Sequence, residues 1–319
     1  MITNGLPIFL KATYGITAIS ISPAKGGFST KASYHVVGID GREYFVKVYD
    51  RFLPTTRLFV DRIEEYMPVL AWLTTSPALQ GRLLTPIPAL DGRYKTESEM
   101  DVYAVFLFVH GETPGIDGIT QEQTKALAQT LARLHDTSVA TTFKTSGLEE
   151  DLSLAFCHRL TAYLDTSKSK QNRLSSLISP HVHLLLQASH ETLHLRDTLR
   201  RGYSPLVLCH GDAHGNNVIQ GEQLVLADWE DLRWAPAEAD LFIYAWHPYG
   251  KLLLDTYTAY RQDFFIHKEL LRYYVLRRRI EDLWVDIQRL TEESPDEAEV
   301  SELYKWIAVS IAEIQNLTC

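Results

Sequence analysis

A polar loop with an aspartate and an asparagine five residues apart follows the apolar residues 206–209. The loop begins at His210 and contains Asp212 and Asn217. A carboxylate beside a bound cation can orient a substrate hydroxyl and accept its proton while a phosphate is attacked. The triplet from His210 to Asp212 is, by itself, equally consistent with an Asx-type turn, so the assignment depends on what lies nearby.

The residues after this loop predict a hairpin of two short strands with a turn centred between Glu222 and Gln223. That centre places Asn217 opposite Asp228. Directly opposed residues of antiparallel strands hold their Cβ atoms about 5 Å apart. One amide oxygen and one carboxylate oxygen at such a distance suit Mg²⁺, which keeps room for water and phosphate oxygens. The spacing therefore predicts a magnesium site.

Two motifs carry a family resemblance. The segment 210–217, His-Gly-Asp-Ala-His-Gly-Asn-Asn, resembles the H-G-D-x-H-x-x-N signature of the aminoglycoside phosphotransferase and choline kinase superfamily. Asp228-Trp229-Glu230 resembles the second aspartate motif of that superfamily, and 228–241 and 278–283 look closest to its spectinomycin phosphotransferase branch. The resemblance implies an α+β, bilobal protein-kinase-like fold that binds ATP (or GTP) and Mg²⁺.

The resemblance also assigns roles within the catalytic loop. It implies that Asp212 is the catalytic base and that Asn217 and Asp228 are the magnesium ligands. It further implies that His210 and Asp240 support the loop, with Asp240 accepting hydrogen bonds from backbone amides.

A kinase-like small lobe needs a strand lysine that holds the α- and β-phosphates and a helix glutamate that holds the lysine. Lys47, in a strand-like segment, is the expected lysine, and Phe45 and Tyr49 share its face of the strand. Glu64 is the expected partner of Lys47, with Glu65 as the alternative.

The nucleotide is expected to contact two further segments. Gly26 and Gly27 lie in the loop 25–30, which resembles the nucleotide-covering loop without its full G-x-G-x-x-G pattern. Phe108 lies in the expected interlobe hinge, whose backbone groups would bind adenine.

A cationic acceptor requires carboxylates where it binds, and the candidates are Glu230, Asp231, Glu281 and Asp282, with Asp286 a weaker one. The alternative is that the acids near 281–286 form helical ion pairs with Arg277, Arg278, Arg279 and Arg289. Tryptophans could stack on a sugar ring or a cation, although most helix tryptophans are core residues. They are Trp229, Trp234, Trp246 and Trp284.

The elements that position these residues divide the chain into a small β-rich lobe, 1–109, and a larger helical lobe, 110–319. The expected strands are 19–23, 32–39, 43–49 and 103–109, and apolar spacing predicts a helix over 57–73 that Pro68 bends. Thr120 and Gln123 form a capping box at the start of a helix. Ser294 is the expected N-cap of the last helix.

The chain has 319 residues and a formal net charge of −9, which disfavours nucleic acid as a partner. Its longest apolar run, 103–109, is too short to cross a bilayer, and its three cysteines are far apart. No signal peptide is apparent at the N-terminus. We therefore expect a cytoplasmic protein that acts on a small, cationic molecule; its oligomeric state is left open.

The residues leave the acceptor undecided. The preferred acceptor is an aminoglycoside or an aminocyclitol; the main alternative is a metabolite such as choline, ethanolamine, a sugar or an amino acid. A second alternative is a metal-dependent hydrolase, because His210, Asp212, His214 and Asp228 are also plausible transition-metal ligands. A non-catalytic nucleotide-binding module is disfavoured, since the lysine, both aspartates and the asparagine of the motifs are all present.

Overall fold

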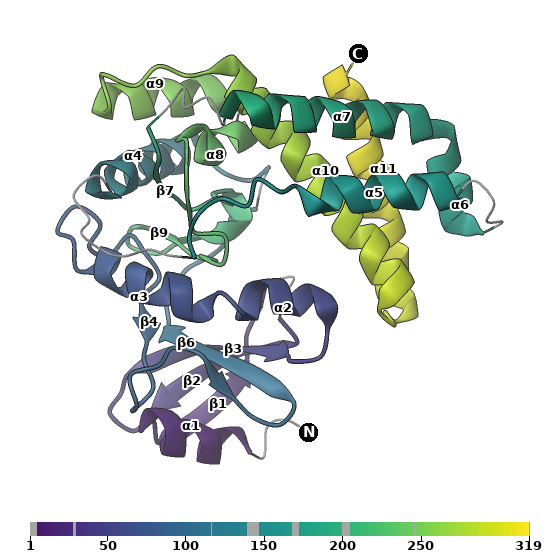
Figure 1. Cartoon of the computed structure of the whole chain (residues 1–319). Helices are drawn as coiled ribbons and strands as arrows, with labels where there is room; N and C mark the ends of the chain where they lie inside the picture. Colours follow the sequence, from purple (N-terminus) through teal and green to yellow (C-terminus); the bar gives the residue numbers. More distant parts are fainter. Residues whose placement is uncertain are drawn as a thin grey trace. The chain divides into compact units, whose positions relative to one another are not determined.

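The computed structural model describes residues 5–27, 30–115, 117–138, 147–167, 172–199, 205–244 and 247–318. The chain packs into two compact units (Figure 1). One comprises Met1–Glu149 and Leu206–Phe265, and the other comprises Glu150–Pro205 and Ile266–Cys319. The α+β class expected from the sequence is confirmed. The lobe boundary between residues 109 and 110 stays a prediction. It was defined by the expected nucleotide-binding lobe, whereas the two units are defined by how closely their residues pack.

The first unit contains an antiparallel sheet in the order β1-β2-β3-β6-β4, with β5 also paired to β6. The long strands lie within a residue or two of the expected segments. They are β1 (Ala18–Pro23), β2 (Ala32–Gly38), β3 (Glu43–Asp50) and β6 (Asp101–Leu107), joined by the short β4 (Pro86–Ile87) and β5 (Thr96–Glu97).

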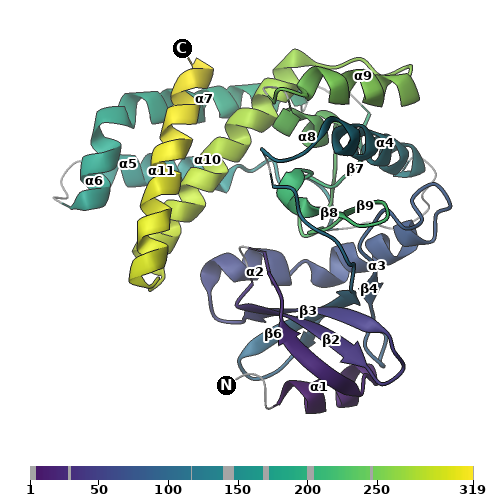
Figure 2. The same ribbon diagram turned by 180° about the vertical axis from the view of Figure 1, so that it is seen from behind.

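The two faces of this sheet are covered differently. Helix α1 (Leu6–Tyr14) packs on one face, where Leu10 joins Val36 and Val46 in a buried apolar cluster. Helices α2 (Pro54–Val60) and α3 (Ile63–Thr74) lie on the other side in both views (Figures 1 and 2). The single helix expected over 57–73 is thus two helices, and Pro68 lies inside α3.

The rest of the first unit carries the loop 210–217, the expected catalytic loop. Strand β7 (Val207–Cys209) pairs with β10 (Arg233–Ala235), and β8 (Val218–Gln220) pairs with β9 (Leu224–Leu226). A single 3-10 turn, η3 (Gly215–Asn217), precedes β8. The surrounding helices are α4 (Gln121–Ser138), α8 (Glu238–Leu241) and α9 (Gly250–Tyr260). The capping box predicted for α4 is confirmed by reciprocal hydrogen bonds between Thr120 and Gln123.

The second unit is helical among its described residues. It comprises α5 (Ala155–Ser167), α6 (Arg173–Ile178), α7 (Val182–Leu199), α10 (Lys268–Glu292) and α11 (Glu297–Thr318). Within it, Arg277 and Glu150 form a buried ion pair to which the Tyr274 hydroxyl also donates. In the part of the chain that the structure describes, none of the helices has the length and apolar character needed to span a membrane.

Candidate active site

Lys47 is the centre of a buried polar cluster in the first unit. Its Nζ atom lies 2.6 Å from Oδ1 of Asp228 and 2.5 Å from Oε1 of Glu230, and only 2% of its surface is exposed. The Tyr49 hydroxyl donates to the same Glu230 oxygen at 2.9 Å. Burial by itself would lower the pKa of Lys47, but the charges of Asp228 and Glu230 outweigh it and raise the pKa. Lys47 is therefore a fixed cation.

Glu64 does not contact Lys47. Its carboxylate accepts hydrogen bonds from the backbone N–H groups of Tyr94 and Lys95, at 2.8 and 2.5 Å. The reason is the phase of α3, which buries Ile63, Tyr66 and Leu70, so that Glu64 lies outside the buried face of the helix. The structure thus replaces the expected Lys47–Glu64 pair with a Lys47–Glu230 pair.

The alternative partner, Glu65, is also engaged elsewhere. Its carboxylate lies 3.7 Å from the guanidinium of Arg62, the residue just before the helix. The guanidinium in turn donates to the backbone carbonyls of Glu230 and Leu232, at 3.1 and 2.7 Å. The beginning of α3 therefore anchors the segment that follows Asp228.

Asp240 holds the start of the catalytic loop, as the family resemblance implied. Its buried carboxylate accepts hydrogen bonds from the backbone N–H groups of His210 and Gly211, at 2.9 and 2.6 Å, and from the His135 ring at 2.9 Å. Burial raises the pKa of Asp240, but the hydrogen bond from His135, the nearby His135 and His210 rings and the Gly211 N–H together outweigh it, and the pKa is lowered. Asp240 is thus an ionised anchor of the loop.

His210 and Gly211 give the loop its shape. Nε2 of His210 lies 2.7 Å from the Ala227 carbonyl, and Nδ1 lies 3.2 Å from the Asp212 N–H, so the neutral ring with its proton on Nε2 fits both partners. Gly211 has a φ of 83°, and a Cβ there would lie 2.7 Å from the Asp231 carbonyl oxygen. Only glycine fits this position without strain.

Asp212 and Asn217 lie in hydrogen-bond contact. The Asn217 amide donates to the backbone oxygen and to Oδ2 of Asp212, at 2.8 and 2.9 Å. Oδ1 of Asp212 lies 3.3 Å from the His214 ring. Because the side-chain amide nitrogen of Asn217 faces Asp212, the side-chain oxygen of Asn217, Oδ1, is the atom left to bind a cation.

The hairpin register differs from the predicted one by a single residue. Val218 pairs with Leu226, and the Ala227 N–H donates to the Asn217 carbonyl at 2.8 Å, so Asn217 lies opposite Ala227 rather than Asp228. The turn holds an odd number of residues, 221–223, which moves its centre. A slip of one residue turns a side chain to the other face of a strand.

A left-handed backbone conformation compensates for this slip at Asp228. Its φ is 60°, one of two such values among the described non-glycine residues, and its side chain reaches Lys47. The other oxygen, Oδ2, lies 3.1 Å from the position that a Cβ on Gly27 would take. The donor set fits Mg²⁺, because Asn217 and Asp228 offer hard oxygen atoms and Lys47 occupies only one Asp228 oxygen.

The nucleotide-side candidates lie on the first unit. Gly27 follows β1 and lies against the Asp228 carboxylate, and Gly26 precedes it; Phe28 and Ser29 of the same loop lie outside the described residues. The Phe108 ring stacks on His35 at 3.8 Å between centroids. The backbone N–H of Phe108 donates to the Glu43 carbonyl at 2.9 Å. That N–H therefore extends the β3–β6 ladder; adenine binding by the backbone groups of the hinge stays a prediction.

The candidate substrate acids have different surroundings. Glu230 is buried beside Lys47, which replaces its expected substrate role. Asp231 is one-third exposed and lies 3.4 Å from the Arg233 guanidinium. In the second unit, Glu281 lies 3.8 Å from Arg277, and Asp282 lies 2.9 Å from Arg278. The helical ion pairs weighed for Glu281 and Asp282 are therefore present.

The tryptophan candidates are mostly core residues. Trp229 is 1% exposed, and its indole N–H donates to the Leu226 carbonyl. Trp284 is buried in the second unit, and Trp234 lies half-buried in β10. Trp246 lies outside the described residues.

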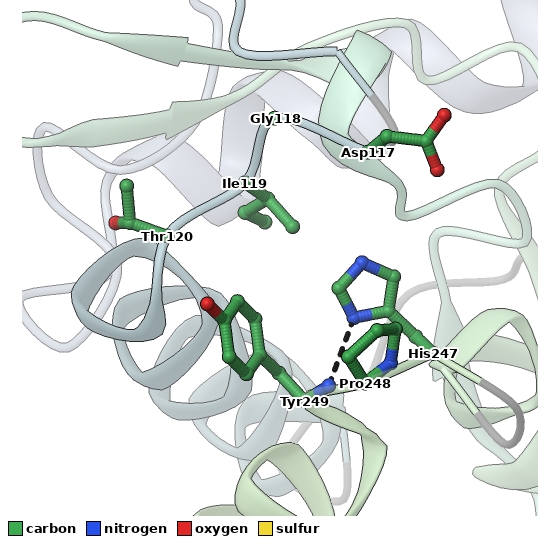
Figure 3. Close-up of a pocket in the computed structure, with 7 residues that line it drawn as sticks. All are labelled: Asp117, Gly118, Ile119, Thr120, His247, Pro248 and Tyr249. Atoms are coloured by element: carbon green, nitrogen blue, oxygen red, sulfur yellow. Dashed lines mark hydrogen bonds between the residues drawn. The ribbon is translucent and has the colours of Figure 1, made fainter.

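A cavity of about 370 Å³ opens in the first unit beside the starts of α4 and α9 (Figure 3). The His247 ring accepts a hydrogen bond from the Tyr249 N–H, and Asp117 provides a carboxylate. Its lining residues are Asp117, Gly118, Ile119, Thr120, His247, Pro248 and Tyr249. None of the residues predicted for catalysis or nucleotide binding is among them.

A family model, described as the phosphotransferase enzyme family, matches residues 20–274. A search of curated protein sequences found no match. The matched residues include both motifs and the lysine at the centre of the buried cluster.

Solved structures resemble the whole chain. A spectinomycin phosphotransferase in complex with ADP and spectinomycin is 20% identical, with a TM-score of 0.71 over 99% of this chain and 98% of that chain. An amicoumacin kinase in complex with AMP-PNP and Ca²⁺ is 13% identical, with a TM-score of 0.63 over 98% and 93%. A microcompartment-associated aminopropanol kinase is 17% identical, with a TM-score of 0.62 over 96% and 94%. These likenesses show that the chain has the kinase-like fold.

Proposed function

Because this chain belongs to the phosphotransferase enzyme family, we propose that it transfers phosphate from ATP to a hydroxyl of a small aminated molecule. The preferred acceptor is an aminoglycoside or an aminocyclitol of the spectinomycin class, and the proposed compartment is the cytoplasm. Antibiotic resistance is the corresponding physiological role.

One observation carries this proposal. Lys47, from the N-terminal sheet, contacts Asp228, which lies 181 residues further along the chain beside the catalytic loop. Phosphoryl transfer requires a lysine that binds the phosphates, a carboxylate that binds a cation and a second carboxylate that orients the attacking hydroxyl. The fold brings all three into one unit.

Each residue then has a defined task. Asp212 orients the acceptor hydroxyl and takes its proton, and Lys47 contributes an N–H donor to the phosphates. Asn217 and Asp228 would hold Mg²⁺, which neutralises charge on the transferred phosphate when it is bound. Asp240 and His210 keep Asp212 in place through the backbone of the loop.

The test is phosphate transfer from labelled ATP to a panel of spectinomycin, classical aminoglycosides, choline and aminopropanol. We expect transfer to spectinomycin or an aminoglycoside, and we expect Asp212→Asn to lower kcat by about a thousandfold or more while the KM for ATP stays within about threefold. Activity within tenfold of wild type in that variant would remove Asp212 from its role.

A metabolite kinase of the same fold is the second candidate. Two observations favour it: the likeness to an aminopropanol kinase, and the ion pairs that Glu281 and Asp282 already make with arginines. Transfer to choline or aminopropanol alone in the panel would select this candidate.

The hydrolase alternative has less support. Its expected ligands, His210, Asp212, His214 and Asp228, do not form a metal-ligand cluster among the described residues. Both ring nitrogens of His210 already have backbone partners.

A further inference from the structure

We infer that Glu230, and not a glutamate of α3, is the residue that positions Lys47 for phosphate binding. This inference rests on the proposed function in one respect, namely that Lys47 is the phosphate-binding lysine. Glu230 is then a positioning residue, because it acts on the nucleotide only through Lys47.

The contact itself has the features of a fixed pair. Oε1 of Glu230 lies 2.5 Å from Nζ of Lys47, and the two side chains are 9% and 2% exposed. A buried pair lasts only when its remaining polar atoms are also satisfied. The Tyr49 hydroxyl meets this requirement by donating to the same Glu230 oxygen at 2.9 Å.

Helix α3 presents an aromatic residue to this cluster in place of an acid. Tyr66 is 0% exposed, and its hydroxyl has no hydrogen-bond partner in the structure. Burial and the charge of Glu230 both raise its pKa, which shows that the hydroxyl lies in the field of that carboxylate. The position facing Lys47 on α3 is therefore occupied by a neutral ring.

The helix acts on the lysine indirectly. Arg62, just before α3, donates to the backbone carbonyls of Glu230 and Leu232. These bonds fix the backbone that carries the Glu230 side chain, so a movement of α3 would reach Lys47 through Arg62.

One short segment consequently contributes both partners of Lys47. Asp228 and Glu230 take two of the three N–H donors of the ammonium group, and one donor is left for a phosphate oxygen. The lysine and the expected magnesium ligand are thereby linked through Asp228-Trp229-Glu230.

The experiment compares Glu230→Gln and Tyr49→Phe with Glu64→Gln, the matched change on α3. KM for ATP and kcat are measured for each variant. In parallel, Lys47 is acylated with an amine-reactive ester and quantified by mass spectrometry against Lys251, whose side chain is 86% exposed. Circular dichroism verifies that each variant is folded.

We expect Glu230→Gln to raise the KM for ATP about tenfold, with a smaller change in kcat, and to raise Lys47 acylation about fivefold. Tyr49→Phe, which keeps the Glu230 carboxylate, raises the KM for ATP and the acylation of Lys47 by smaller factors. Glu64→Gln leaves both within about twofold. Should Glu230→Gln fail to fold, Tyr49→Phe decides between the arrangements.

Two results overturn the inference. One is a change in KM and acylation in Glu64→Gln without a change in the other two variants. The other is a changed Mg²⁺ dependence in Glu230→Gln with unchanged acylation, which would make Glu230 a metal ligand. If the protein transfers no phosphate to any acceptor, the acylation result still decides the position of Lys47, so failure of the proposed function is distinguishable.

Discussion

Asp240 and Lys47, two buried charged side chains of the first unit, are held by specific partners rather than by solvent. Asp240 is ionised because His135 and two backbone amides donate hydrogen bonds to its carboxylate. Lys47 is charged because its ammonium group contacts two carboxylates. Asp286 in α10 is the contrasting case. Burial and the nearby charge of Asp282 raise its pKa to about 7, and Arg289 offsets only part of this effect.

Asp286 predicts a pH dependence of stability. Its folded-state pKa of about 7 lies above the ordinary value of 3.8, so the folded protein binds the proton more tightly. This stabilisation is complete below pH 3.8 and is lost as the pH rises through about 7. Asp286→Asn removes the loss, so the variant should exceed wild type in unfolding free energy at pH 8 by roughly 4 kcal/mol.

Chemical denaturation at pH 5 and pH 8 measures this difference. The gap between Asp286→Asn and wild type should widen with pH. An equal gap at both values would show that the folded-state pKa of Asp286 lies below pH 5.

Motif residues could be predicted from the sequence because their types and spacing are unusual together. The signature implied that Asp212 and Asn217 serve one site, and the structure places their side chains in hydrogen-bond contact. The partner of Lys47 could not be chosen by charge alone. The phase of α3 was the missing signal, since its apolar residues Ile63, Met67 and Leu70 place Glu64 on the outer face.

At the level of elements, the hairpin and the loop before it determine where the carboxylates lie. The sequence predicted both strands, β8 and β9, but the assumed centre of the turn, between Glu222 and Gln223 instead of at Glu222, shifted their register by one residue. The left-handed backbone at Asp228 was also not predictable from its residue type. Similarly, α11 begins after Asp296, which caps Glu299, rather than at the expected Ser294.

The backbone conformation of Gly211 lets us predict how Gly211→Ala changes stability and activity. The residue has a φ of 83°, and a Cβ there would lie 2.7 Å from a backbone oxygen, so strain and a clash add together. We expect the free energy of unfolding to fall by about 2–4 kcal/mol, with loss of activity. Thermal and chemical denaturation measure this change.

Gly92→Ala is the matched control. Its φ of 86° is similar, but a Cβ there would have no atom within 4 Å. The expected loss is about 1 kcal/mol, from backbone strain alone. Equal losses in the two variants would mean that the clash at Gly211 is relieved by movement of the loop.

The whole molecule divides in a way that a linear pattern cannot reveal. The segment Leu206–Phe265 returns to the unit that contains the N-terminal sheet, whereas Glu150–Pro205 packs with the C-terminal helices. Periodicity identified most helices and strands because it is local. Which segments share a unit depends on contacts between residues far apart in sequence, about which periodicity carries no information.

The folded molecule should be stabilised by its nucleotide. A ligand that binds only the folded state adds about 2.7 kcal/mol at a hundred times its Kd. We expect a non-hydrolysable ATP analogue with Mg²⁺ to raise the melting temperature, measured by calorimetry. Chelation of Mg²⁺ should remove most of the increase, because the phosphates would lose the cation that we propose Asn217 and Asp228 bind. An unchanged melting temperature with analogue and Mg²⁺ would contradict ATP binding.

The engagement of Glu64 and Glu65 with partners other than Lys47 has a consequence for how this sequence tolerates variation. Neither acid reaches Lys47, so replacements that preserve the helix should accumulate there among functional variants. The three positions 228–230 have no such latitude, since each side chain is committed to a different contact. In a saturation library selected for activity, many residue types should therefore be recovered at positions 64 and 65, and almost none besides the present ones at positions 228–230.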